Sequence, residues 1–116
     1  MKKEFRVKTN QDFQKVLKCK KINSSVFIVY FNKNNMSHPR FGIAASKKLG
    51  NAVVRSTVRR KVRAMIYENL KEQKILNLDY VLIVKKNFFE KTYQENKNEL
   101  ADIFQNIWRK NNEENI

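Results

Sequence analysis

The chain contains few of the residues that cross-link, break or interrupt a fold. Its 116 residues include one cysteine, Cys19, so an internal disulfide is impossible and a zinc site made only of cysteines is excluded. One proline and two glycines leave no long flexible linker, and we expect a single domain over residues 1–116. No apolar run approaches the roughly 20 residues of a membrane span, and the first residues lack the apolar stretch of a signal peptide. We therefore expect a cytoplasmic protein with no membrane partner.

Acidic residues are absent from a long central stretch. Between Phe13 and Tyr67 there is no Asp or Glu, against thirteen Lys or Arg, and the whole chain carries a net charge of +14 at pH 7. Positive charge concentrated in this way is typical of proteins that bind a polyanion such as nucleic acid. A solvated helix face is the alternative on charge alone. A membrane surface would require an exposed apolar helix face, which the pattern does not provide.

The same absence of acids argues against hydrolytic chemistry by the protein itself. A protein nuclease uses metal-binding carboxylates or a pair of histidines. The basic stretch has no carboxylate, and His38, beside Pro39, is the only histidine. Asp12 and Asp79 suit a helix-capping and a strand-start role. We therefore assign no catalytic residue and no metal ligand to the protein.

Apolar periodicity predicts three helices and three strands in the order α-β-β-α-β-α. The expected helices are residues 9–21, about 53–70, and a last one that follows the capping box of Thr92 and Glu95. The expected strands are residues 25–31, 40–46 and 79–86, with the second antiparallel to the first and a basic loop over 47–51. The predicted fold class is α+β, a small, mainly antiparallel sheet packed by helices.

Two of the predicted elements show which faces should be buried. The apolar stripe of the central helix consists of Val54, Val58, Val62, Met65, Ile66 and Asn69 or Leu70. The stripe of the last helix consists of Leu100, Ile103, Phe104, Ile107 and Trp108. The strand over 25–31 shows no polar alternation, so we expect both of its faces to be covered or used.

A row of arginines lies beside the stripe of the central helix. At 100° per residue, Arg55, Arg59 and Arg63 fall within about 80° of arc, and Arg60 lies at about 140°. These are four of only seven arginines, whereas lysines number eighteen. Arginine binds phosphate through two parallel hydrogen bonds and stacks on bases, while like charges four residues apart weaken a helix. The row therefore predicts an anion-binding surface.

The segment from Arg40 to Arg63 resembles the signature of the bacterial ribonuclease P protein family. The resemblance is carried by Arg40-Phe41-Gly42-Ile43, the run from Ser46 to Arg55, and Arg59, Arg60 and Arg63. Segments 8–18, 27–30, 79–86 and 92–104 are also similar to the family in the same order, so the resemblance covers nearly the whole chain. Ser56 stands where the family usually has Asn, Thr57 where it often has Arg or Lys, and Leu17 replaces a frequent aromatic.

The resemblance implies both a fold and a function. The fold is the ribosomal protein S5 domain 2-like fold, with a left-handed β-α-β crossover between strands 40–46 and 79–85, where the general rule predicts a right-handed one. The function is that of the protein subunit of ribonuclease P, the ribonucleoprotein endonuclease that removes the 5′ leader from precursor tRNA. The RNA subunit, with bound Mg²⁺, performs the hydrolysis. The protein binds this RNA and the leader and lowers the magnesium requirement.

The resemblance also implies two RNA-binding surfaces. The residues expected to contact the catalytic RNA are Lys47, Asn51, Arg55, Ser56, Arg59, Arg60 and Arg63. The residues expected to line a cleft for the single-stranded leader are Phe13, Leu17, Ile28, Tyr30, Ala44 and Ser46, with Lys48 and Lys85 nearby. Apolar and aromatic surfaces accept bases of any sequence, and cations at the rim follow the backbone. For Phe13, Ile28 and Tyr30 an ordinary core position is the alternative, and periodicity alone favours it.

Two other classes of protein remain open from the residues alone. A ribosomal protein or RNA chaperone would bind ribosomal RNA and leave tRNA processing unaffected. A protein-only nuclease would cleave without an RNA cofactor. Loss of Arg59 and Arg60 should cripple the ribonuclease P subunit and the ribosomal protein but need not affect a protein-only nuclease.

Overall fold

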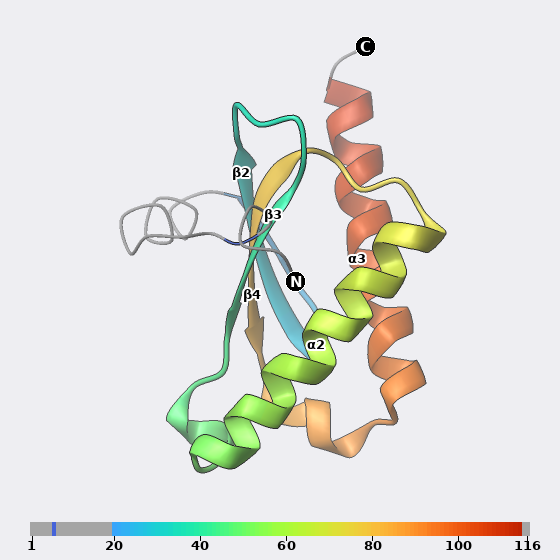
Figure 1. Ribbon diagram of the computed structural model, residues 1–116. Coiled ribbons are helices and arrows are strands. Elements are labelled where there is room, and N and C mark those ends of the chain that lie inside the picture. Colours follow the sequence, from blue (N-terminus) through green and yellow to red (C-terminus); the bar gives the residue numbers. More distant parts are fainter. Residues whose placement is uncertain (1–5, 7–19, 115–116) are drawn as a thin grey trace.

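The computed structural model in Figure 1 describes Arg6 and residues 20–114. Its four strands are β1 (Lys20–Asn23), β2 (Phe27–Lys33), β3 (Arg40–Ala44) and β4 (Leu78–Val84). Its long helices are α2 (Ala52–Glu72) and α3 (Tyr93–Glu114), and two short 3₁₀ helices are η2 (Lys47–Leu49) and η3 (Lys86–Glu90). The α+β class and the order of β2, β3, α2, β4 and α3 agree with the prediction. The predicted helix over 9–21 lies outside the described residues, except that 20 and 21 belong to β1.

The sheet has the order β1-β2-β4-β3, so the last strand in the chain lies between two earlier ones. Strand β2 pairs with β4 in antiparallel fashion, and β3 pairs with β4 in parallel fashion. The directions of β2 and β3 are therefore opposite, as predicted, but the two strands are not neighbours. Strand β1, which pairs antiparallel with β2, was not predicted, because Lys20, Lys21 and Asn23 give it no apolar alternation.

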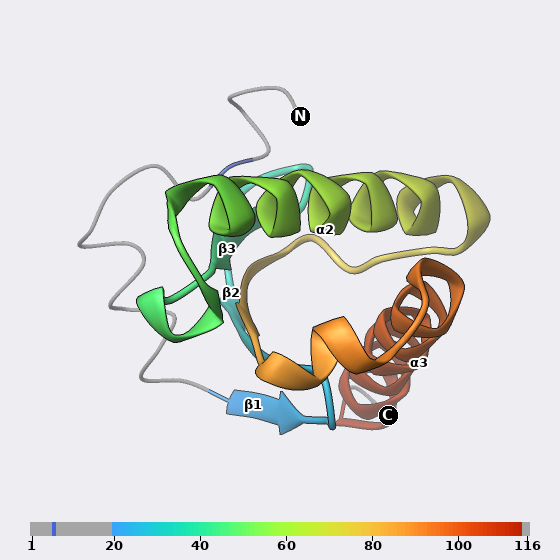
Figure 2. The same ribbon diagram turned by 90° about the horizontal axis from the view of Figure 1, so that it is seen from below.

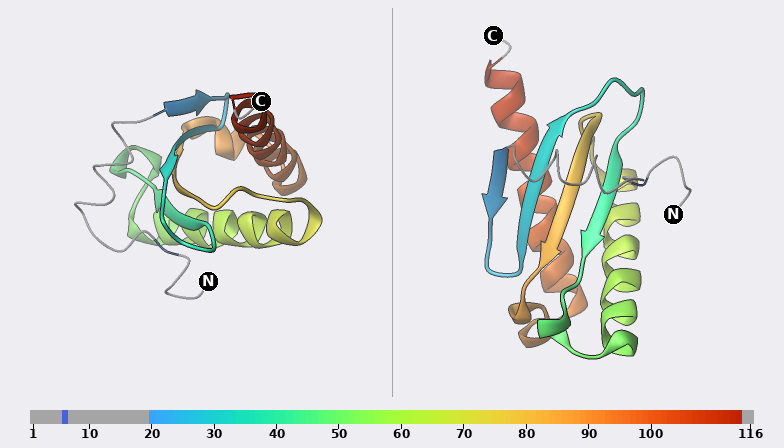
Figure 3. Two further views of the ribbon diagram at one scale, coloured as in Figure 1. Left: turned by 90° about the horizontal axis from the view of Figure 1, so that it is seen from above. Right: turned by 90° about the vertical axis from the view of Figure 1, so that its left-hand side faces the viewer.

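The connection from β3 through α2 to β4 is left-handed. In the right-hand view of Figure 3, both helices lie behind the sheet, β3 and β4 run downwards, and β4 lies to the left of β3. If this view is rotated by 180° in the plane of the page, β3 and β4 point upwards and β4 lies to the right of β3, with α2 still behind the sheet. A step to the right through a helix behind the sheet is a left-handed crossover. The general rule therefore fails here, and the resemblance to the family gave the correct handedness. This connection places α2 along the β3 edge of the sheet (Figure 2).

Both helices cover the same face of the sheet, and the core lies between them and the strands (Figure 2). Strand β2 alternates between buried and half-buried residues, so its odd-numbered residues Phe27, Val29 and Phe31 point into this core. The predicted stripes of both helices are confirmed, except that Val54, Leu70 and Trp108 are only half-buried. The centre of the core is a cluster of Phe41, Tyr80 and Phe104, in which the first two rings stack at 5.2 Å between centroids.

The acids of the second half of the chain hold elements together. Glu99 of α3 accepts hydrogen bonds from the hydroxyls of Ser24 and Ser25 and from the N–H of Val26, and pairs with Lys91 at 3.0 Å. Burial raises the pKa of Glu99, but these hydrogen bonds together outweigh it and lower the pKa to about 2. The carboxylate thus fastens the β1–β2 turn to α3.

A second group of charges joins the two helices. Lys97 of α3 forms ion pairs with Glu68 at 2.9 Å and with Glu72 at 2.8 Å, both on α2. Hydrogen bonds to these two carboxylates raise the pKa of Lys97 to about 12. The predicted capping box at the start of α3 is confirmed, because the N–H of Glu95 donates to the hydroxyl of Thr92 and the N–H of Thr92 donates to the Glu95 carboxylate.

Candidate nucleic-acid interface

The run Leu49-Gly50-Asn51 sets the start of α2 and so the position of the arginines. Leu49 is buried in the core, and Gly50 has φ +147°, a conformation that L side chains rarely adopt. A Cβ at Gly50 would also lie 3.0 Å from Cγ1 of Val54. The Asn51 side chain accepts a hydrogen bond from the N–H of Val54 at 3.0 Å and caps the helix. Asn51, predicted as an RNA contact, therefore has a structural role in this chain.

The predicted arginine row is present on one side of α2. Arg55, Arg59 and Arg63 are half-buried and Arg60 is exposed. None of the four forms an ion pair with a described residue. The Nε of Arg55 is shielded from solvent and has no hydrogen-bond partner among the described residues. This surface offers guanidinium groups that no described carboxylate neutralises.

Positive charge is concentrated at the Arg63 end of the arginine row. The backbone of Arg6 forms a parallel bridge with Phe41 of β3. Burial, together with the charges of Arg6 and Arg59, lowers the pKa of Arg63. An arginine remains charged even with such a shift, so Arg63 keeps its charge beside those of Arg6 and Arg59. A bound anion would relieve their mutual repulsion.

The remaining residues predicted to contact the catalytic RNA flank the row. Lys47 is exposed in η2, which lies directly before α2 (Figure 1). Ser56 is exposed. The hydroxyl of Thr57, the other departure from the family pattern, donates to the carbonyl of Val53 within the helix. The structure thus brings Lys47 and the arginines onto neighbouring elements.

The second predicted surface lies on the sheet face away from the helices, which we call the helix-distal face (Ile28, Tyr30, Gly42, Ala44, Val81 and Ile83). Alternation and register place these residues together, because Ile28 is opposite Ile83 and Ala44 is opposite Ile83 on its other side. Ile28 and Tyr30 are half-buried and lie outside the core cluster, so the ordinary-core alternative is wrong for these two residues.

Three further residues belong to this face and were missed from the sequence. Val81 and Ile83 alternate with the core residues of β4, and of these two only Ile83 is partly exposed, because Val81 is fully buried. The ammonium of Lys21 lies 5.8 Å from the centroid of the Tyr30 ring. Strand β4 is apolar throughout most of its length, so the sequence did not show which of its residues face away from the core. The register with β2 supplies that information.

Five predicted leader-binding residues remain. Phe13 and Leu17 lie outside the described residues. Ser46 and Lys48 are exposed at η2, just beyond the end of β3. Lys85 follows β4, and its ammonium donates to the Asn23 side chain and to the carbonyl of Ser24 at 2.6 Å. Lys85 therefore closes the β1–β2 turn, and two of its three donors are already engaged.

The two surfaces meet at η2. Strands β3 and β4 are parallel, so their carboxyl ends lie at the same edge of the sheet, and η2 leads from that edge to the start of α2 (Figure 3). Lys47 and Lys48 thus lie between the helix-distal face and the arginine row. A single RNA-bearing assembly could contact both surfaces without crossing the face that the helices cover.

The described residues contain no group of three or more His, Cys, Asp or Glu side chains placed to hold a metal ion. Asp79, one of the acids considered from the sequence, forms a two-pronged ion pair with Arg40, with contacts of 2.8 Å and 2.6 Å, and accepts a hydrogen bond from Asn34. It fixes the start of β3 beside the start of β4. None of the helices described has the length and apolarity to cross a membrane.

Comparison with solved structures agrees with this arrangement. The ribonuclease P protein of Staphylococcus aureus is 32% identical, with a TM-score of 0.77 over 87% of this chain and 93% of that chain. The protein of Thermotoga maritima is 26% identical, with a TM-score of 0.78 over 87% of this chain and 96% of that chain. The fold, with one basic surface on α2 and one partly apolar surface on the sheet, is thus that of an α+β RNA-binding protein of the kind found in ribonuclease P.

Comparison of the sequences gives the family. The family model described as Ribonuclease P matches residues 1–108. A ribonuclease P protein component from Bacillus cereus is 42% identical over 106 residues, which are 90% of this chain and 91% of the relative. One from Mesoplasma florum is 33% identical over 104 residues, covering 89% of this chain and 94% of the relative. The chain belongs to the ribonuclease P protein family.

Proposed function

We propose that this chain is the protein subunit of a cytoplasmic ribonuclease P that removes the 5′ leader from precursor tRNA. The observation that carries the proposal is the arginine row of α2, which no described carboxylate neutralises and which lies next to a partly apolar sheet face. The family relationship indicates the enzyme to which the subunit belongs. The basic surface and the apolar surface indicate two binding tasks for the subunit.

The first task is to bind the catalytic RNA through Lys47, Arg55, Ser56, Arg59, Arg60 and Arg63. Guanidinium groups without acidic partners bind phosphates with release of the counterions of the RNA. Phosphates brought close together in the folded RNA repel one another, and the protein's cations screen this repulsion. Less Mg²⁺ is then needed for the same RNA fold. The catalytic Mg²⁺ itself is held mainly by the RNA subunit.

The second task is to bind the leader on the helix-distal face, with Ile28, Tyr30 and Ala44 as the surface for bases. Phe13 and Leu17 complete this cleft by the family pattern. Ser46, Lys48 and Lys85 lie at the carboxyl edge, where the leader backbone would run. Aromatic and aliphatic side chains hold bases of any sequence, which suits a subunit that must accept many different leaders.

Reconstituted cleavage tests the function. A precursor tRNA is incubated with a bacterial ribonuclease P RNA at low Mg²⁺, with and without the protein. We expect mature tRNA and free leader to form much faster when both RNA and protein are present. Absence of acceleration with a cognate RNA would overturn the proposal, and cleavage by the protein alone would replace it with a protein nuclease.

Binding of two forms of tRNA tests the leader surface. Tyr30→Ala should weaken binding of leader-bearing tRNA to the holoenzyme roughly tenfold, because one stacked base is lost. Binding of mature tRNA should be unchanged. Tyr67→Ala, at an exposed tyrosine of α2 outside both surfaces, is the matched control and should leave both affinities unchanged. An equal loss for the two tRNA forms would contradict a leader site at Tyr30.

A further inference from the structure

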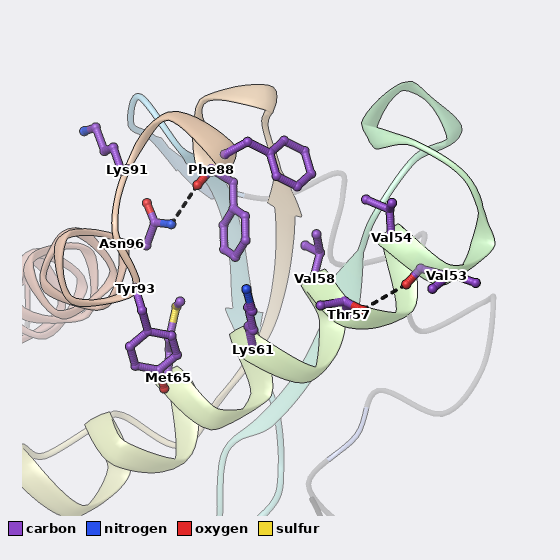
Figure 4. A pocket seen from close by; sticks show the side chains of 11 residues that line it. Val53, Val54, Thr57, Val58, Lys61, Met65, Phe88, Lys91, Tyr93 and Asn96 are labelled. Carbon is purple, nitrogen blue, oxygen red and sulfur yellow. Dashed lines mark hydrogen bonds between the residues drawn. The ribbon is translucent and has the colours of Figure 1, made fainter.

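A cavity of about 300 Å³ lies on the helix side of the molecule, on the flank of α2 opposite the arginine row. It is formed by the first half of α2, by η3 and by the start of α3 (Figure 4). A cavity of this volume is at the small end of the range for ligand sites. It can take one planar group of nucleobase size, but it is too small for a second helix or a strand.

The walls of the cavity are apolar and aromatic, and part of this surface is exposed. Phe88 is buried beneath it, whereas Phe89 is 50% exposed and Val53 is 74% exposed. The rings of Phe88 and Phe89 meet edge to face, with their centroids 5.8 Å apart. The hydroxyl of Tyr93 donates to Glu68 at 2.9 Å, which fixes the orientation of its ring.

The charge at the cavity indicates an anionic ligand. Lys61 points from α2 toward η3 (Figure 4) and forms no ion pair with a described residue. Two of the nearby carboxylates are engaged, since Glu68 is paired with Lys97 and Glu99 with Lys91, whereas Glu90 of η3 is exposed. Of the two lysines that line the cavity, Lys91 is paired with Glu99, so Lys61 is the one that no described carboxylate pairs with. An apolar peptide would gain nothing from Lys61, whereas a nucleotide brings both a base and a phosphate.

The position of Lys61 connects the cavity with the arginine row. Arg59, Arg60 and Lys61 are consecutive on α2, so at 100° per residue they step around the helix from the row to the rim of the cavity. Arg60 is exposed between the two. Phosphates that follow these three residues would carry an RNA strand over the outer side of α2. The next base would then lie over Phe89.

We propose that this cavity binds one unpaired nucleotide of the RNA strand held along the arginine row, with the base against Phe89 and Tyr93 and the phosphate on Lys61. The inference rests on the proposed function, because it needs RNA on α2. The nucleotide belongs either to the catalytic RNA or to the precursor tRNA. The chemistry of recognition is the same for both.

Two substitutions at the cavity have controls of the same residue types on α2, outside the cavity. Tyr67 and Lys71 are a second aromatic and lysine pair on α2, with the ammonium 4.3 Å from the ring centroid, and neither lines the cavity. Phe89→Ala should weaken RNA binding roughly tenfold. Lys61→Gln should lower the salt dependence of binding by about one phosphate contact. Tyr67→Ala and Lys71→Gln should change neither quantity.

The full-length variants are titrated separately with a ribonuclease P RNA and with a precursor tRNA, and the RNA that loses affinity is the source of the nucleotide. A photoreactive benzophenone side chain at position 89 should cross-link to one RNA position, and the same group at position 67 should not. Equal affinities for Phe89→Ala and the unaltered protein, without a specific cross-link, would overturn the inference. So would a cross-link to a protein. If the unaltered protein bound neither RNA, the proposed function would fail as well, so the two failures are distinguishable.

Discussion

The two halves of α2 use charge in opposite ways. In the first half, Arg55, Arg59, Arg60 and Lys61 have no acidic partner among the described residues. In the second half, Glu68 and Glu72 are both paired with Lys97 of α3. The helix backbone and the buried stripe continue through both halves without a break. One helix therefore serves as a docking element at its second half and as an RNA-binding element at its first.

This difference shows how the chain keeps a high positive charge without losing its fold. Acids are absent where the protein is to meet phosphate, and they return where helices must be held against each other. Repulsion along the arginine row costs a few tenths of a kcal/mol per pair. The buried stripe, which continues beneath the row, contributes several times as much per residue. Packing decides that the helix forms, and the charges decide what it binds.

The largest expected effect is on stability, in the second half of α2. Ile66 is fully buried and does not line the cavity, so Ile66→Ala should lower the free energy of unfolding by about 2–5 kcal/mol, because it removes buried apolar atoms and leaves a void. Urea denaturation measures this loss. RNA affinity, measured where the variant is still fully folded, should stay within about twofold. A large loss of affinity under those conditions would break the division between the two halves.

The opposite result is expected in the first half. Arg59→Ala combined with Arg60→Ala should weaken binding of the catalytic RNA roughly a hundredfold at low salt, and the slope of log affinity against log salt should fall by about two. Stability should change by no more than about 0.5 kcal/mol. Lys71→Ala combined with Lys74→Ala removes the same charge from exposed positions further along the chain and should have little effect. Equal losses in both pairs would mean that total charge alone drives binding.

Glu99 shows what paired charge contributes to stability. Glu99→Gln should lower stability by about 2 kcal/mol at neutral pH, because hydrogen bonds to a charged acceptor are lost. The pKa of Glu99 is about 2 in the folded protein, below its ordinary value of 4.5. Its contribution is therefore fully present above pH 4.5 and is lost as the pH falls toward 2. The unaltered protein should lose stability across this window faster than Glu99→Gln. Glu90→Gln, at an exposed acid, should behave like the unaltered protein.

The smallest effect concerns Asn51, the capping residue of the first half. Asn51→Ala should cost about 1 kcal/mol of stability, and Asn51→Ser should retain most of it, because serine also caps. If capping is the only role of Asn51, RNA affinity should be the same in the Asn51→Ser variant and in the unaltered protein. A loss of affinity in the Asn51→Ser variant would show that the amide also contacts RNA.

Local patterns predicted the helices well and the sheet only in part. The stripe of α2 and the Thr92–Glu95 capping box depend on residues three or four apart, which the sequence shows directly. The insertion of β4 between β2 and β3, and the left-handed crossover, depend on pairings between residues far apart in the chain, which no local pattern contains. Strand β1 exists because β2 offers it an edge. Its own residues Lys20, Lys21 and Asn23 have little preference for a strand.

The candidate site divides in the same way. The arginine row could be predicted from helical spacing, and the structure places its members together. Membership of the helix-distal face depended on the β2–β4 register, so Val81 and Ile83 were missed while Ile28 and Tyr30 were found. Asn51 and Lys85 have conformational roles that their chemistry alone did not reveal. The cavity beside Phe89 is formed by elements that are distant in sequence, and no motif marks it.

The central place of β4 in the sheet has a consequence for how the chain folds. During synthesis, β2 and β3 emerge before β4. They do not pair with each other, because β4 lies between them in the sheet. The loop between β3 and β4 must close before the parallel pair forms, and such non-local pairing is slow. A nascent chain that ends before Leu78 can form the β1–β2 hairpin, but it lacks β4, the strand that joins this hairpin to β3. The arginine row therefore leaves the ribosome, a particle rich in RNA, before the fold that orients it is complete.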